Sequence, residues 1–214
     1  MEKGNHMLRI YIVRHGETLF NVQNKIQGWC DSPLTEKGIR QAKAVGKGLK
    51  MIPFVSCYCS TSERVMDTAQ LILEGRDVPI YPTKKLKELN FGSIEGDSEE
   101  KLFSLGFEKM AEGFVDLGGE TMNMLLKRVM SALEEIRQNT PDGNVLVVSH
   151  GGAIITLLSS LDAKVREGLM DAANPRGVEN CSVSILVDKK GEWVVEEAGN
   201  TAYRDCYETE DACE

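Results

Sequence analysis

Short apolar runs alternate with amphipathic segments along most of the chain. Residues 8–13, 54–59 and 145–148 are runs rich in branched and aromatic side chains, which are typical of buried strands. Residues 36–50 and 121–139 instead carry apolar side chains every three or four positions, which predicts amphipathic helices. Because strands alternate with helices, the pattern predicts an α/β fold: a three-layer α/β/α sandwich around a mostly parallel central sheet.

Smaller elements complete this pattern. Residues 78–81 predict a short strand. The apolar runs at 181–187 and 193–197 flank the polar turn Asp188-Lys189-Lys190-Gly191, so they predict a β-hairpin that adds antiparallel strands at one edge of the sheet. The segment after residue 150 is apolar nearly all round, and we expect it to form a buried helix.

The domain boundaries follow from length and composition. A chain of 214 residues fits one domain, which we place at residues 7–200. Within it, residues 97–120 mix large apolar side chains with charges and glycines, and this predicts a small helical insertion that serves as a lid. Residues 1–6 are interpreted as a leader or a cloning remnant, and residues 201–214 as an acidic tail that is mobile at its end.

The charge balance narrows the class of ligand. Lysine and arginine number 25 against 33 aspartates and glutamates, so the net charge is −8. This argues against nucleic-acid or anionic-membrane partners, which require a basic face. It is compatible with a small anionic substrate, because a few arginines can make one pocket positive. We see no signal peptide and no apolar run near the ~20 residues of a membrane span.

The six cysteines are dispersed and contain no CxxC pair. Cys57 and Cys59 lie two apart in a predicted strand, without a nearby histidine or second cysteine pair. We therefore interpret them as small buried hydrophobic residues and predict no metal site. Together with the missing signal peptide, the pattern predicts a cytoplasmic protein.

Candidate chemistry lies where the predicted strands end. His15 follows Arg14 at the end of the first strand, and His150 comes shortly after the 145–148 run. A third strand ends at Ser60, with Arg64 one helical turn later. Because open α/β sheets bind ligands at the carboxyl ends of their strands, we expect these side chains to converge if the strands are neighbours.

Four potentially cationic groups in one crevice require an anion. Without one, each of Arg14, His15, Arg64 and His150 would be desolvated beside like charge. A phosphoryl group is the simplest ligand, and the N-termini of the helices after Ser60 and His150 would add N–H donors.

Four ordered blocks of residues carry a resemblance to a known family. The blocks are Arg14-His15-Gly16-Glu17-Thr18 with Asn21, Gly28, Asp31, Leu34-Thr35, Gly38 and Gln41-Ala42; Ser60, Arg64 and Thr68-Ala69; Leu86, Glu88, Gly92 and Glu95-Gly96; and Ser149-His150-Gly151-Gly152. With these blocks, residues 8–155 resemble the histidine phosphatase superfamily, on its phosphoglycerate-mutase-like branch.

The resemblance implies a role for each candidate. His15 would be the nucleophile that forms a phosphohistidine, and Arg14 and Arg64 beside it should lower its pKa. Arg14, Arg64 and His150 would hold the phosphoryl oxygens and stabilise the charge of the transition state. Glu88 would protonate the leaving oxygen and then deprotonate the attacking water.

The same resemblance suggests further residues that contact the phosphate and two rivals for the role of acid. The expected contacts to the phosphate or the pocket mouth are Thr18, Asn21, Gln27, Gly28 and Gly151. Glu17 and Glu95 compete with Glu88 for the role of acid. In the acid-phosphatase branch the proton donor is an aspartate after the second histidine, and Gly151 stands there in this sequence.

The residues of the insertion help to distinguish a phosphatase from a mutase. A phosphoglycerate mutase needs extra cations that grip the substrate carboxylate, and arginines suit that task. This chain has no arginine between Arg76 and Arg128, and the insertion offers only Lys101 and Lys109. The sequence therefore favours a phosphatase, without cofactor, that acts on a small phosphorylated metabolite with some non-polar surface. A phosphoglycerate mutase and a non-catalytic phospho-ligand-binding module are the alternatives, and the oligomeric state is left open.

Overall fold

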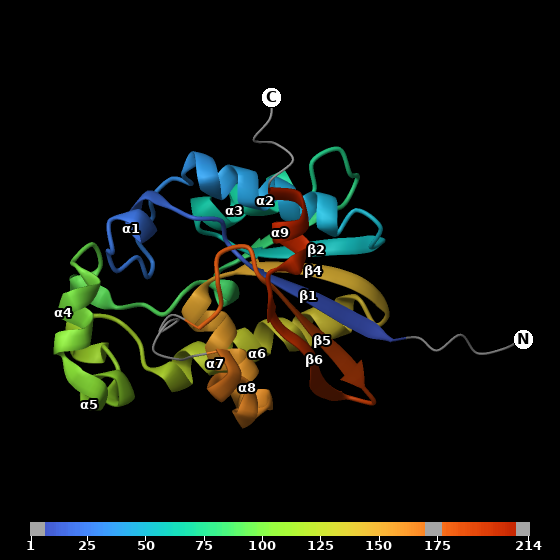
Figure 1. The fold of residues 1–214 in the computed structure, drawn as a ribbon. Coiled ribbons are helices and arrows are strands. Elements are labelled where there is room, and N and C mark those ends of the chain that lie inside the picture. Colours follow the sequence, from blue (N-terminus) through green and yellow to red (C-terminus); the bar gives the residue numbers. More distant parts are fainter. Residues whose placement is uncertain (1–6, 170–176, 209–214) are drawn as a thin grey trace, which may run out of the picture.

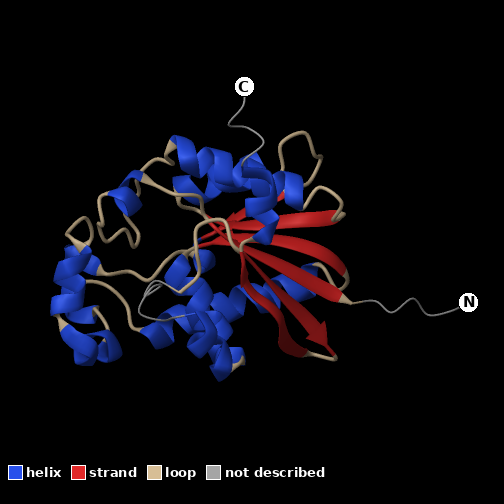
Figure 2. Ribbon diagram, viewed as in Figure 1, coloured by secondary structure: helices blue, strands red, loops and turns tan. Residues whose placement is uncertain are grey.

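The computed structural model describes residues 7–169 and 177–208, and within them the strands form one sheet (Figures 1 and 2). The order across the sheet is β3-β2-β4-β1-β5-β6. The strands are β1 (Leu8–Arg14), β2 (Phe54–Ser60), β3 (Ile80–Thr83), β4 (Gly143–Ser149), β5 (Val183–Lys189) and β6 (Glu192–Asn200). The first four are parallel to one another, whereas β5 and β6 run antiparallel at one edge.

Alternation along the strands creates two cores, one on each face of the sheet. On β1, Ile10 and Ile12 belong to one apolar cluster, and Tyr11 and Val13 belong to the other. Both faces are therefore buried, which explains why the parallel strands are continuous apolar runs in the sequence.

Helices cover the two faces as separate layers (Figure 2). One layer contains α2 (Glu36–Gly48), α3 (Glu63–Ile72) and α9 (Ala202–Glu208); the other contains α6 (Met122–Asn139), α7 (Gly151–Leu161) and α8 (Ala163–Leu169). Thr35 begins α2, where its side chain accepts a hydrogen bond from the Gly38 amide. The α/β/α sandwich is thus confirmed.

The insertion lies away from the sheet, next to the short helix α1 (Leu19–Val22) (Figure 1). It contains α4 (Glu99–Ser104), α5 (Gly106–Glu112) and the 3₁₀ turn η3 (Val115–Leu117), and two further 3₁₀ turns, η1 (Lys84–Leu86) and η2 (Gly92–Ile94), precede it. The start of the insertion is tied to the loop after α1, because Gly96, just before it, donates to the Ile26 carbonyl at 2.8 Å and Glu99 donates to that of Asn24 at 2.8 Å.

The structure differs from the predicted elements in three places. The edge strand β3 lies two residues later than predicted and includes Pro82, which an edge strand tolerates. The helix α8 was not among the predicted elements. Ala202–Glu208 is not a tail but α9, which approaches α2 so closely that a Cβ on Gly48 would lie 2.1 Å from the Tyr203 carbonyl oxygen. Residues 1–6 and 209–214 lie outside the described residues.

Within the described ranges, none of the helices has the length and apolar character needed to cross a membrane.

Candidate active site

The pairing of β1 with β4 brings the two histidines together. In the parallel register Arg14 is opposite Ser149, so the residues that follow, His15 and His150, leave the sheet side by side. Their ring centroids lie 5.4 Å apart with an interplanar angle of 68°. Both residues are almost inaccessible, at 3% exposed for His15 and 0% for His150. The predicted convergence of these strand ends is therefore present in the fold.

His15 has a defined tautomer. Its Nδ1 lies 2.8 Å from the carbonyl oxygen of Gly16, and because a carbonyl oxygen only accepts, Nδ1 carries the proton. The lone pair of the neutral ring is therefore on Nε2. Burial, followed by the Arg64 and Arg14 guanidinium charges, holds the pKa of His15 well below its ordinary value. The ring is consequently a neutral base with a free electron pair at neutral pH.

His150 has the opposite tautomer. A guanidinium only donates, so Arg64 Nη2 donates to His150 Nδ1 at 2.9 Å, and the ring proton is on Nε2. That proton is donated to Ser60 Oγ, 2.9 Å away at the end of β2. The pKa of His150 is also held well below its usual range, first by burial and then by Arg64. His150 therefore joins the ends of β2 and β4.

Arg64 is fully buried at the start of α3 and is held by the loop after α1. Nη1 donates to the Cys30 carbonyl (2.9 Å) and to Asp31 Oδ1 (2.6 Å). Nη2 donates to the Gly28 carbonyl at 3.0 Å in addition to His150. Of the five guanidinium N–H groups, only that of Nε lacks a hydrogen-bond partner among the described residues.

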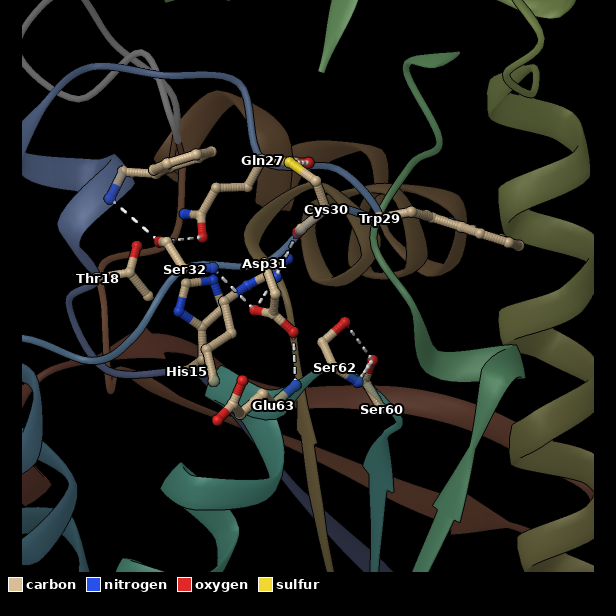
Figure 3. Close-up of polar contacts among 12 residues, drawn as sticks. His15, Thr18, Gln27, Trp29, Cys30, Asp31, Ser32, Ser60, Ser62 and Glu63 are labelled. Atoms are coloured by element: carbon tan, nitrogen blue, oxygen red, sulfur yellow. Dashed lines mark hydrogen bonds and ion pairs between the residues drawn. The ribbon is translucent and has the colours of Figure 1, made fainter. Parts of the chain in front are cut away.

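The helix N-termini already hold carboxylates. Asp31 Oδ2 accepts from the Glu63 amide at 2.5 Å, where α3 begins (Figure 3). Glu88 Oε2 accepts from the Gly152 amide at 2.8 Å, in the first turn of α7. At each of these two helix N-termini, one N–H group is thus bound by one of the protein's own carboxylates, which suits the partial positive charge of a helix N-terminus.

Arg14 approaches the same place from β1. Its Nη1 donates to the Val178 carbonyl at 2.6 Å. A Cβ on Gly151 would lie 3.3 Å from Arg14 Nε and 3.4 Å from Cζ, so the glycine leaves room for the guanidinium beside the start of α7. Arg14, His15, Gly151 and His150 therefore lie in one cluster.

Glu88 is the best placed of the three candidate acids. Its carboxylate accepts from the amides of Leu89 and Gly152, both at 2.8 Å, and the second of these amides belongs to the residue two positions after His150. A Cβ at position 152 would lie 2.6 Å from Glu88 Oε1, so a larger residue there would force this carboxylate to shift. The observed place of the Glu88 carboxylate therefore requires Gly152.

The two rival carboxylates are engaged elsewhere. Glu95 accepts from the backbone amides of Trp29 (2.8 Å), Cys30 (2.7 Å) and Phe91 (3.1 Å), so it ties two loops together. Glu17 accepts from Thr35 Oγ1 at 2.9 Å and from the Lys37 ammonium at 3.1 Å. These contacts favour Glu88 as the acid.

The predicted binding residues have structural partners as well. Thr18 caps α1 and forms a reciprocal capping box with Asn21. Gln27 Oε1 accepts from Ser32 Oγ at 3.3 Å, and the Gly28 carbonyl binds Arg64. All four lie in the segment between β1 and α2, and their contact with a phosphate stays a prediction.

One residue near the site was missed from the sequence, and another has contacts that its place in a family block did not indicate. Asn180 donates from Nδ2 to the His15 carbonyl (2.9 Å) and to Asn21 Oδ1 (3.3 Å), so it connects the loop before β5 to His15. Asp31 was part of a family block, but its contacts with Arg64 and α3 were not foreseen. A lone asparagine in a loop outside the matched blocks gives no signal in one sequence.

In the part of the chain that the structure describes, no three His, Cys, Asp or Glu side chains are grouped as ligands of a metal ion.

The buried histidines make stability depend on pH. Both have a folded-state pKa below the value of 6.5 expected in the unfolded chain, so below that pH the unfolded state binds more protons. The contribution of the two histidines to stability is constant above this window and is lost as the pH falls through it. We expect each histidine to remove about 1.4 kcal/mol of unfolding free energy per pH unit below about pH 6.

Urea unfolding between about pH 7 and pH 5 measures this slope. His15→Asn should reduce the slope, because one of the two buried imidazoles is then absent. An unchanged slope would contradict the neutral buried state of His15.

Comparison with known proteins agrees with this geometry. The family model of the histidine phosphatase superfamily (branch 1) matches residues 10–201. A Yersinia pestis (strain Pestoides F) protein named probable phosphoglycerate mutase GpmB is 36% identical over 211 residues, covering 93% of this chain and 96% of the relative.

Solved structures show the same similarity. Phosphoglycerate mutase from Bacillus anthracis str. Sterne superposes with a TM-score of 0.80 at 33% identity, covering 95% of this chain and 97% of the other. Alpha-ribazole phosphatase from Shigella flexneri gives a TM-score of 0.77 at 25% identity, covering 91% and 97%. Phosphatases and mutases are thus both among the similar proteins. The chain belongs to the histidine phosphatase superfamily and is an enzyme of the phosphatase or mutase kind.

Proposed function

We propose that this protein is a phosphatase that hydrolyses a small organic phosphate monoester through a phosphohistidine. The observation that carries the proposal is the state of His15. Its Nδ1 proton is bound by the Gly16 carbonyl, so a neutral Nε2 lone pair lies in a cluster with Arg14 and His150. A neutral imidazole beside buried guanidinium groups suits attack on a phosphoryl group, whose negative charge the cations stabilise.

The reaction takes place in two steps that share one acid. In the first, His15 Nε2 attacks phosphorus, the P–O bond to the leaving group breaks, and the carboxylic acid of Glu88 donates its proton to the departing oxygen. In the second, the Glu88 carboxylate takes a proton from water as that water attacks phosphorus and the P–N bond breaks. Inorganic phosphate leaves, and the neutral ring and the protonated acid are restored.

The charges of the insertion support hydrolysis over isomerisation. A mutase must hold the carboxylate of phosphoglycerate in addition to its phosphate. The two lysines of the insertion are both paired with carboxylates, Lys101 with Asp97 and Lys109 with Asp116, each at 2.5 Å. Each lysine thus already has a carboxylate partner, and the insertion has no arginine to bind the carboxylate of phosphoglycerate.

The apolar surface of the insertion supports a substrate with some non-polar character. Phe103, Leu105 and Val115 are large apolar side chains that are exposed on it. A leaving group with non-polar surface would bury part of this area, at about 25 cal/mol per Å². We propose a small phosphorylated metabolite of that kind as the partner in the reaction.

Product analysis tests the proposal. The protein is incubated separately with p-nitrophenyl phosphate and with 3-phosphoglycerate plus 2,3-bisphosphoglycerate. We expect inorganic phosphate from the aryl ester and no isomerisation that exceeds hydrolysis, because the insertion has no arginine and each of its two lysines already has a carboxylate partner. Isomerisation far faster than hydrolysis would support the mutase instead. Binding of phosphate without turnover of any ester would support a non-catalytic module.

A further inference from the structure

Arg128 holds the loop that carries Glu88. This arginine projects from α6, and its guanidinium donates to the backbone carbonyls of Lys85 (3.0 Å), Lys87 (2.5 Å) and Glu88 (2.7 Å). The Glu88 carbonyl also accepts from Trp29 Nε1 at 2.8 Å. The backbone of the acid is therefore fixed by two side chains from distant parts of the chain.

Glu120 completes the arrangement from the other side. Its Oε1 accepts from Arg128 Nη2 at 2.5 Å and from the Asn90 amide at 3.0 Å, and its Oε2 accepts from Arg128 Nε at 3.1 Å. The Glu120 amide donates in turn to the Asn90 carbonyl at 2.9 Å. The pair consequently binds the loop that carries Glu88 on both sides of this residue, at Lys85 and Lys87 before it and at Asn90 after it.

The pair is largely shielded from water, with side-chain exposures of 17% for Arg128 and 9% for Glu120. A buried guanidinium that is engaged by several acceptors cannot be replaced by lysine without loss of contacts, because an ammonium donates from a single point. The hydrogen bonds of Arg128 therefore depend on the shape of its guanidinium, and a positive charge alone at this position would not reproduce them.

We infer that Glu120 and Arg128 are positioning residues that hold Glu88 in place for proton transfer. The inference rests on the proposed function, because Glu88 acts as an acid only in that reaction. Neither side chain needs to touch the substrate, since both act through the backbone between Lys85 and Asn90. A misplaced acid loses most of its effect, because general acid catalysis requires hydrogen-bond reach of the leaving oxygen.

The test compares two esters that differ in their need for an acid. p-Nitrophenyl phosphate releases a stable phenolate and needs little protonation, whereas an alkyl phosphate such as glycerol phosphate needs a proton on its leaving oxygen. The quantity measured is kcat/KM, which reports the step that forms the phosphohistidine. The variants are Arg128→Lys and Glu120→Gln, with Glu88→Gln as the reference for a lost acid.

We expect Arg128→Lys to lower kcat/KM for the alkyl ester by about tenfold or more, and by less than about threefold for the aryl ester. In a Glu88→Gln background, Arg128→Lys should cost nothing further on the alkyl ester, because its effect passes through the acid. Arg137→Lys is the matched control: this arginine lies on the same helix and pairs with Asp188 at 2.7 Å, away from the loop.

Equal losses on both esters, or an additive loss in the Glu88→Gln background, would show a merely structural role and overturn the inference. A wild-type protein that turns over neither ester contradicts the proposed function instead. Amide hydrogen exchange then tests the inference without an activity assay. In Arg128→Lys the amides of residues 85–91 should exchange faster than in the wild type, and the exchange rates of β4 should not change. Unchanged exchange in that loop overturns the inference.

Discussion

His15→Ala removes the proposed nucleophile, and we expect kcat/KM for p-nitrophenyl phosphate to fall by about 10⁴-fold or more. The remaining cations can still bind a phosphoryl group, but no other described side chain offers a neutral lone pair in the same position. Loss of the covalent route therefore removes both steps of the reaction. Rapid quench in base with labelled substrate should detect a phosphoprotein in the wild type and none in His15→Ala.

Folding of the variant is checked by thermal unfolding at about pH 7 and about pH 5. The stability of His15→Ala relative to the wild type should rise as the pH falls, because the variant no longer keeps this buried imidazole neutral. A folded variant that still forms an acid-labile phosphoprotein would exclude His15 as the nucleophile.

Arg64→Ala is expected to have the second largest effect, on both stability and activity. The side chain is fully buried and supplies hydrogen bonds to two loop carbonyls, to Asp31 and to His150. Removal of one partner from a buried charge pair typically costs about 3–5 kcal/mol, and we expect a loss of that size in urea unfolding. We also expect kcat/KM to fall by about 10²-fold or more, because a cation proposed to stabilise the transition state is lost and His150 loses the donor that fixes its tautomer.

Arg76→Ala provides a matched control. Arg76 also donates to backbone carbonyls, those of Leu49 and Ile52, and its guanidinium lies 4.9 Å from the Phe54 ring centroid, at the opposite end of β2 from Ser60. It should lower stability without changing kcat/KM of the folded fraction. If Arg64→Ala behaved in the same way, the role of Arg64 would be structural alone.

The main features of the site could be predicted because they depend on strand ends. A parallel strand that is covered on both faces must be apolar throughout, so β1 and β4 are visible in the sequence and the residues after them are located without knowledge of tertiary contacts. Sheet geometry then brings His15 and His150 together. The glycines at 151 and 152 could also be noticed, although only the structure shows that they make room for Arg14 and Glu88.

Features that depend on long-range packing could not be predicted. The helix α9 has an acidic composition like that of a tail, and its position depends on the close approach of Tyr203 to Gly48. The partners of Arg64 come from a loop more than thirty positions earlier in the chain, with separations of 33 to 36 residues for Asp31 and Gly28. The contact of Asn180 with His15 spans 165 residues. No local pattern encodes such pairings.

The register between β1 and β4 restricts how the chain can change length. Side chains alternate between the two faces of a sheet, so one residue inserted into either strand would turn its histidine toward the wrong layer. The insertion that contains α4 and α5 has no such restriction, because it lies outside the sheet. Among related chains, gaps in an alignment should therefore fall between residues 97 and 120, and be absent between Leu8 and His15 and between Gly143 and His150.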